Sequence, residues 1–152
     1  MDSTGSDRIE KAIVLRAPRA RVWRALTNAG EFGAWFRVKL EGDFAPGKKV
    51  SGRITYPGYE HLTMELVVER MEPEELFSYR WHPYAVDPQV DYSAEPTTLV
   101  EFRLVEVAGG TELSVTESGF DRIPAERRDE AFRMNSQGWA VQLENIERHV
   151  AT

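Results

Sequence analysis

The chain has 152 residues, a formal net charge of -6 and no cysteine. This length fits one domain that buries roughly 70% of its unfolded surface, enough for a core without covalent or metal cross-links. The lack of cysteine excludes disulfides, thiolate metal sites and cysteine nucleophiles. The acidic balance argues against nucleic acid or an anionic membrane as the main partner, and no apolar run approaches the roughly 18 residues of a membrane helix.

The first seven residues are polar, without the basic start and apolar centre of a signal peptide. We therefore expect residues 1–7 to form a loose tail, residues 8–152 to form a single domain, and the protein to be cytoplasmic. Partial alternation of apolar residues predicts a first strand over residues 8–15. Pro18 can open a helix with an apolar side at Val22 and Leu26, which ends at residues 27–30, and residues 31–35 suggest one further short turn.

From Phe36 onward the pattern changes to period-2 alternation, interrupted by turn residues such as Pro46-Gly47, Pro57-Gly58 and Gly109-Gly110. Short turns between strands favour antiparallel hairpins. The segment 83–96 contains three prolines and is predicted to be a long loop, a kind of segment that often carries function in a compact domain. The predicted strands in this part of the chain cover residues 36–41, 50–56, 59–71, 76–82, 97–107 and 111–118.

Residues 125–150 are predicted to form one long helix. Its apolar stripe needs a broad apolar surface, and the preceding strands would supply that surface as a sheet. The expected fold is therefore α+β, with a curved antiparallel sheet of about six or seven strands around the helix and two short helices after the first strand. The stripe consists of Phe132, Ser136, Trp139, Leu143, Ile146 and Val150.

Residues 110–120, with the sequence GTELSVTESGF, followed by Gly138-Trp139, resemble the activator-of-heat-shock-chaperone-ATPase-like family of the START-like (SRPBCC, polyketide cyclase-like) superfamily. The opening from Ala17-Pro18 to Trp35-Phe36 looks like the first helix of that family, and the resemblance spans about residues 9–150. It implies a helix-grip fold with a cavity between sheet and C-terminal helix, which in this superfamily commonly holds an apolar small molecule. Some members cyclise polyketides, and the name-giving protein stimulates a chaperone ATPase, but a shared fold does not transfer an activity.

Glu117 is the carboxylate that the pattern singles out. By alternation it shares a face with Leu113 and Val115, which we expect to point toward the helix. Such a carboxylate needs a partner or must stay neutral, because burying it alone is costly. It could be a cavity acid that binds a ligand or acts as a general base, or it could be a rim residue that is solvated or paired with an arginine.

Aromatic residues form the second group of candidates, and Trp139 above Tyr79 and Trp81 could form the roof of a cavity. Ordinary core packing is the alternative for these residues. Arg80 and His82 alternate with that face and are expected outside, unless a bulge changes the register. The candidate cavity residues are Tyr56, Met64, Leu66, Tyr79, Trp81, Phe102, Val115, Glu117, Phe132, Trp139 and Leu143.

No metal site or cofactor is expected, because His61, His82 and His149 lack ligand spacing and no HExxH, GxSxG or Walker pattern occurs. Three functions then compete. The first is binding of an apolar or amphipathic small molecule, oriented by Glu117 and tyrosine hydroxyls. The second is a cyclase-like or hydrolase-like enzyme with Glu117 as base, which ranks lower because no second catalytic partner can be named. The third is a co-chaperone that binds a chaperone, although an activating arm would normally need more sequence than this domain.

Overall fold

The computed structural model describes residues 8–87 and 89–151, so the predicted tail at residues 1–7 lies outside the described residues. Its centre is one antiparallel seven-stranded sheet in the order β1-β7-β6-β5-β4-β3-β2. Strands β2 to β7 therefore form a meander, and β1 pairs with β7 at one edge. The strands are β1 (Arg8–Leu15), β2 (Val38–Glu41), β3 (Lys49–Ile54), β4 (Thr63–Glu72), β5 (Leu76–Trp81), β6 (Thr98–Val107) and β7 (Gly110–Ser118).

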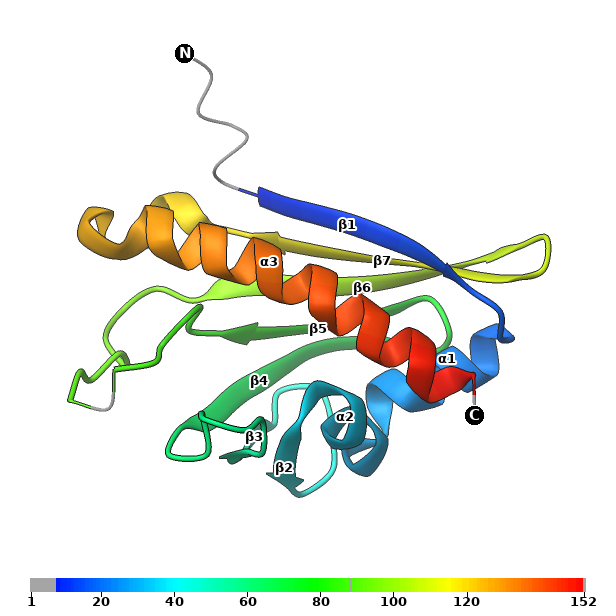
Figure 1. Ribbon diagram of the computed structural model, residues 1–152, viewed down its shortest axis with the longest axis horizontal. Helices are drawn as coiled ribbons and strands as arrows, with labels where there is room; N and C mark the ends of the chain where they lie inside the picture. Colours follow the sequence, from blue (N-terminus) through cyan, green and yellow to red (C-terminus); the bar gives the residue numbers. More distant parts are fainter. Residues whose placement is uncertain (1–7, 88, 152) are drawn as a thin grey trace, which may run out of the picture.

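The helix α3 (Ala125–Val150) lies across the concave face of the sheet, as Figure 1 shows. Its predicted bounds and stripe are confirmed, since Trp139, Leu143 and Ile146 are all buried. On the inner face of the sheet, every second residue is buried, for example Met64, Leu66 and Val68 of β4. The α+β helix-grip prediction is therefore confirmed.

The helices α1 (Arg19–Thr27) and α2 (Ala29–Phe36) follow β1 and lie beside the C-terminal end of α3 (Figure 1). The two short helices predicted after the first strand are confirmed, and only the extent of the second differs, since it begins at Ala29 rather than at residue 31 and ends at Phe36. Asn28 caps α2 by accepting a hydrogen bond from the Glu31 amide at 2.9 Å, which stabilises two full turns. Arg37 then ends the helix in the left-handed region, with φ 74°.

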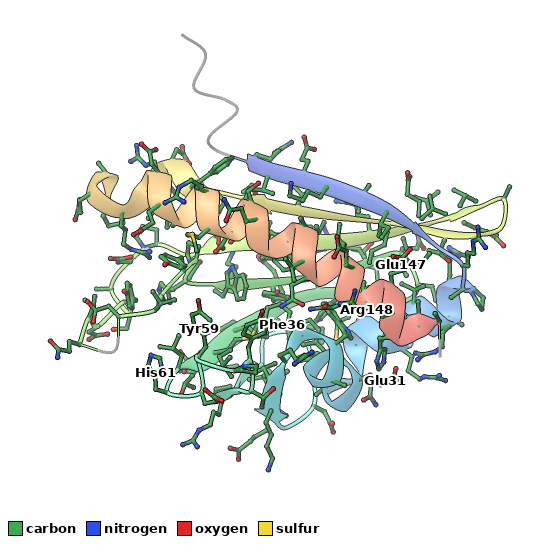
Figure 2. All side chains as sticks on the ribbon, in the orientation of Figure 1. Glu31, Phe36, Tyr59, His61, Glu147 and Arg148 are labelled. Carbon is green, nitrogen blue, oxygen red and sulfur yellow. The ribbon has the colours of Figure 1, made fainter. Side chains whose placement is uncertain are left out.

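Two predicted strand starts also change, and the strand predicted to end at residue 56 ends at Ile54. The strand predicted from residue 36 begins at Val38, because Phe36 belongs to α2. The strand predicted from residue 59 begins at Thr63, because residues 56–62 form turns held by two backbone hydrogen bonds, from Tyr59 N to Tyr56 O and from Leu62 N to Tyr59 O. Tyr59 and His61 therefore lie on the connection between β3 and β4, at the end of the sheet (Figure 2). These changes leave the order of the elements as predicted.

No helix within residues 8–87 and 89–151 is both long and apolar enough to cross a membrane.

Candidate functional site

Glu117 lies on the inner face of β7, opposite Val100 of β6 and Ile9 of β1. Its neighbours on that face, Leu113 and Val115, are buried, so alternation along the strand directs the carboxylate beneath α3. The residue is 0% exposed. The inward orientation expected from the sequence is thus what the structure has, and the alternative of a solvated rim position does not apply.

Four side chains from three other elements donate hydrogen bonds to this carboxylate. On Oε1, Trp139 Nε1 donates at 2.8 Å and Asn135 Nδ2 at 3.0 Å. On Oε2, Thr98 Oγ1 donates at 2.6 Å and Trp81 Nε1 at 2.8 Å, while Asn135 Nδ2 lies 3.2 Å away. We call Glu117 with Trp81, Thr98, Asn135 and Trp139 the Glu117 cluster. It joins β5, β6, β7 and α3 at one point.

None of the four donors is charged. Hydrogen bonds to a carboxylate are stronger than bonds between neutral groups, and here they replace the water that burial removes.

The buried negative charge of Glu117 also affects the neighbouring Tyr79. Burial and then the charge of Glu117 raise the pKa of Tyr79 well above its ordinary value of 10.0, so Tyr79 keeps its proton. The Tyr79 hydroxyl has no hydrogen-bond partner among the described residues.

A pocket of about 260 Å³ opens beside the Glu117 cluster. Trp81 and Asn135 form the wall that it shares with the cluster, and a smaller hollow of about 170 Å³ continues from Phe36, Trp81 and Asn135 to Gly138 of α3. The volume is close to the lower end of the roughly 300–1,000 Å³ typical of ligand sites. The larger part is lined by Phe36, Ile54, Leu62, Thr63, Met64, Glu65, Trp81, His82, Tyr84, Ala85, Val86 and Asn135.

The loop between β5 and β6 forms one wall of the pocket, and α3 holds that loop. Arg127, in the first turns of α3, donates from Nε and Nη2 to Glu95 Oε1 at 2.9 and 2.7 Å, and from Nη1 to Pro83 O at 2.9 Å. Its guanidinium also stacks 4.8 Å above the centre of the Tyr92 ring. These contacts fix the position of Tyr84, Ala85 and Val86, which face the pocket.

His82 was expected outside, and this was wrong. Strand β5 ends at Trp81, so the alternation on which the expectation rested stops one residue earlier. His82 lines the pocket, and its Nε2 lies 3.0 Å from the carbonyl oxygen of Glu95. Because a carbonyl only accepts, Nε2 carries the hydrogen of this bond. Arg80 does lie outside, where it pairs with Glu69 at 3.0 Å.

The other residues singled out from the sequence divide into three groups. Met64 and Trp81 line the pocket and Trp139 lines its smaller hollow, while Tyr56 is 46% exposed and lines neither part. Trp81 and Trp139 lie together, with ring centres 5.8 Å apart, and Tyr79 packs on Trp81 at 5.4 Å. The rest of the set lies outside the pocket lining: Leu66, Tyr79, Phe102, Val115, Glu117 and Leu143 are buried, and Phe132 packs on Phe120.

Sequence reasoning missed Asn135, Thr98, Phe36 and Gly138. Asn135 could have been found, because it precedes Trp139 by four residues and so lies on the same side of α3. Gly138 could also have been found, as a glycine inside a long helix. Thr98 and Phe36 carry no such local signal, since their roles depend on pairing across distant strands and on where α2 ends.

Within residues 8–87 and 89–151, no group of three or more histidine, aspartate or glutamate side chains could hold a metal ion.

The fold and the site define an α+β helix-grip protein with a pocket between the sheet, the β5–β6 loop and the long helix. The chain belongs to the family described as Activator of Hsp90 ATPase homolog 1-like protein, whose family model matches residues 16–151. The resemblance seen in the sequence is therefore confirmed. No curated protein matches the sequence.

Solved structures share the fold at low sequence identity. Protein MLL2253 from Mesorhizobium loti is 22% identical with a TM-score of 0.75, over 95% of this chain and 96% of that one. The Aha1 dimer from Colwellia psychrerythraea is 17% identical with a TM-score of 0.70, over 94% and 95% of the two chains. DynU16, from the dynemicin biosynthetic locus, is 20% identical with a TM-score of 0.74, over 96% of this chain and 48% of that one. At these identities the likeness shows the fold alone.

Proposed function

We propose that this protein binds an apolar or amphipathic small molecule in the pocket between β4, β5, the β5–β6 loop and α3. The observation that carries the proposal is the pocket itself, about 260 Å³ in volume and lined mainly by apolar and aromatic side chains with a few polar groups. This is the composition of sites that bind small organic molecules. DynU16, a structural neighbour, comes from a biosynthetic locus and supports a small molecule as the ligand.

Gly138 supports the same proposal. A glycine inside a helix costs about 1 kcal/mol relative to alanine. Packing does not require it here, because a Cβ at this position would meet no atom within 4 Å. The missing side chain instead leaves the hollow beside Phe36 and Trp81 open. A binding site explains why the helix tolerates this residue.

The enzyme alternative has less support from the geometry. A general base must come within hydrogen-bond reach of the proton that it removes. Glu117 is fully buried, both of its oxygens accept hydrogen bonds from the cluster, and it does not line the pocket. A ligand in the pocket would meet Trp81 and Asn135 before it met the carboxylate.

The test is a variant that fills the hollow without weakening the helix. Gly138→Leu should keep or raise the melting temperature, because leucine is a better helix former than glycine. Ala140→Leu is the matched control, since Ala140 is exposed on α3 and does not line the pocket. Small molecules that co-purify with each protein would be compared by native mass spectrometry and identified after extraction.

We expect the wild type and Ala140→Leu to carry the same bound compound, and Gly138→Leu to lose most of it. Equal loading of all three proteins would contradict the proposed site. A wild type without any bound compound, which also fails to bind a panel of bicyclic aromatic compounds by calorimetry, would reject the binding function. A pull-down that recovered a chaperone in an ATP-dependent manner would then favour the co-chaperone alternative.

A further inference from the structure

We propose that β1 is an interface strand, and that two copies of this chain pair through it, antiparallel, about a two-fold axis at Ala12. The pairing joins the two sheets into one continuous sheet. This inference is independent of the proposed ligand pocket, because β1 contributes no residue to the pocket lining. It follows from the exposed backbone of β1, the side chains along it and the balance of their charges.

Strand β1 is an edge of the sheet, and its outer side is open. It pairs only with β7, over all of its residues from Arg8 to Leu15. About half of the backbone N–H and C=O groups of an edge strand point away from its neighbour. No other hydrogen bond within residues 8–87 and 89–151 reaches the backbone of β1. In Figure 1, β1 runs along a border of the molecule, with no described helix or strand beyond it. Another strand can therefore pair with these groups.

The opposite edge of the sheet is protected against such pairing, and β1 is not. Strand β2 has only 4 residues, and it exposes the charged Lys39 and Glu41. A short length and exposed charges are the devices by which proteins keep sheet edges from pairing. Strand β1 has 8 residues, and its second half, from Ala12 to Leu15, carries no charge. In that half Ala12 is exposed and Val14 is 50% exposed.

A second copy of the chain is the partner that matches this edge. An antiparallel strand pair is symmetric, so an open antiparallel edge is complementary to the same edge of an identical chain related by a two-fold axis. The charges are also balanced: Arg8 and Lys11 are basic, while Glu10 and, on α3 beside the strand, Glu144 are acidic. Two copies therefore repel each other less along β1 than over the rest of a surface whose chain has a net charge of -6.

The charges also select the register of the pairing. Like charges directly opposite each other destabilise an antiparallel pair. An axis at Lys11 would oppose two lysines, and an axis at Glu10 would oppose two glutamates. An axis at Ala12 avoids both and pairs residues 9–15 of each copy, with Lys11 of one copy opposite Ile13 of the other. The two Ala12 side chains then face each other at the axis.

A hollow of about 380 Å³ between β1 and α3 lies along the same edge. Lys11 and Glu144 both line it, but neither forms an ion pair with any described residue. In the register centred on Ala12, Lys11 of each copy lies beside Ile13 of the partner copy, at the hollow that the partner's Glu144 lines. Pairing therefore brings opposite charges of the two copies toward each other. The hollow is lined by Lys11, Ala12, Ile13, Ala140, Leu143 and Glu144.

Analytical ultracentrifugation of the purified full chain tests the pairing. We expect the wild type to shift from the mass of one chain to twice that mass as the protein concentration is raised. Ala12→Lys places two like charges opposite each other at the axis, so it should keep the mass of one chain over the same range. Ala20→Lys is the matched control, because Ala20 is exposed on α1, and it should associate like the wild type.

The absence of cysteine from the sequence allows a second test that does not depend on how the lysine variant folds. Directly opposite residues of an antiparallel pair have Cβ atoms about 4.5–5.5 Å apart, and the lower end of this range suits a disulfide. Under mild oxidation, Ala12→Cys should form a covalent dimer at least about tenfold faster than Ala20→Cys, because pairing raises the local concentration of the thiols. Non-reducing electrophoresis over time would measure both rates.

A wild type that keeps the mass of one chain at every concentration would overturn the proposal and leave an extended segment of another protein as the partner to test at this edge. A doubled mass that Ala12→Lys does not reduce would reject β1 as the interface. Equal rates of covalent dimer formation by the two cysteine variants would reject it as well. None of these results depends on a compound in the pocket, so the proposed function succeeds or fails separately.

Discussion

Two buried or partly buried glutamates near α3 are stabilised in opposite ways. Glu117, beneath the middle of the helix, is fully buried and accepts hydrogen bonds only from neutral side chains. Glu31, near the C-terminal end of the helix in Figure 2, has a side chain that is 24% exposed and binds three basic groups. Arg21 lies 2.7 Å from it, Arg24 2.8 Å and His149 2.9 Å.

The difference follows from the access of water. At the protein surface, charged partners remain solvated on their outer sides, so Glu31 of α2 can bind basic side chains from both α1 and α3 at little desolvation cost. Beneath α3, each added charge would have to be desolvated, and that penalty can exceed the gain from pairing. Neutral donors satisfy the Glu117 oxygens without introducing a second buried charge. The stability that the ion pairs of Glu31 contribute therefore depends on salt and pH, whereas the contribution of the Glu117 cluster depends on packing.

The largest expected effect is from Trp139→Ala in the Glu117 cluster. Trp139 is 2% exposed, so truncation should lower the free energy of unfolding by about 3–5 kcal/mol. Urea denaturation followed by far-UV circular dichroism would measure it. Trp139→Phe is the control, since it keeps most of the ring and loses the hydrogen bond to Glu117. A loss below about 1 kcal/mol for the alanine variant would show that Trp139 is not a core residue.

Glu117→Gln tests whether the cluster needs a carboxylate. The amide group of glutamine would turn a donor toward the donors of the cluster, so at least one donor would lose its acceptor. We expect a loss of about 2–3 kcal/mol in unfolding free energy. Glu112→Gln, on an exposed position of the same strand, should change stability by less than about 0.5 kcal/mol. Equal values for the two variants would contradict the assigned role of Glu117.

Glu31→Gln should cost less, about 1 kcal/mol at pH 7, because its partners are partly exposed. Burial raises the pKa of Glu31, but hydrogen bonds from His149, Arg21 and Arg24 outweigh it and lower the pKa from 4.5 to about 2. A lowered pKa stabilises the fold above pH 4.5, and the contribution is lost as the pH falls toward 2.

The difference between wild type and Glu31→Gln should therefore shrink over that pH range, and it should also shrink in 1 M salt. Parallel denaturation curves at several pH values and salt concentrations would test this. The effect of Glu117→Gln should respond little to salt, because its partners are neutral. A salt response of equal size at both sites would remove the distinction between them.

The smallest expected effect is from Tyr79→Phe. Its hydroxyl is buried without a partner in the described structure, so removing it should leave stability unchanged or raise it by up to about 1 kcal/mol. Thr98→Val removes a hydroxyl that does donate to Glu117, and it should lower stability by about 1–2 kcal/mol. Thermal melts of the two variants would suffice. A clear loss in Tyr79→Phe would show that this hydroxyl has a partner.

Much of the fold could be predicted from the sequence, because its signals are local. Period-2 alternation located the central strands and directed Glu117 inward with Leu113 and Val115, and helical spacing gave α3 its bounds. The composition of the Glu117 cluster could not be predicted, because Trp81 and Thr98 reach Glu117 across 36 and 19 residues of chain. The second short helix was predicted, but its start at Ala29 was not, because the capping role of Asn28 was not recognised. The pocket depends on where β5 ends and on Gly138, which alternation does not describe.

The Glu117 cluster also gives the protein an internal optical probe. The rings of Trp81 and Trp139 lie 5.8 Å apart and are held in fixed orientation by one shared carboxylate. Their ultraviolet transitions should couple and give a paired signal in circular dichroism, which a folded but loosened cluster would lose. Because Trp81 also forms a wall of the pocket, its emission should change when a compound enters. Pocket occupancy could then be followed in solution by tryptophan fluorescence, without a label on either the protein or the ligand.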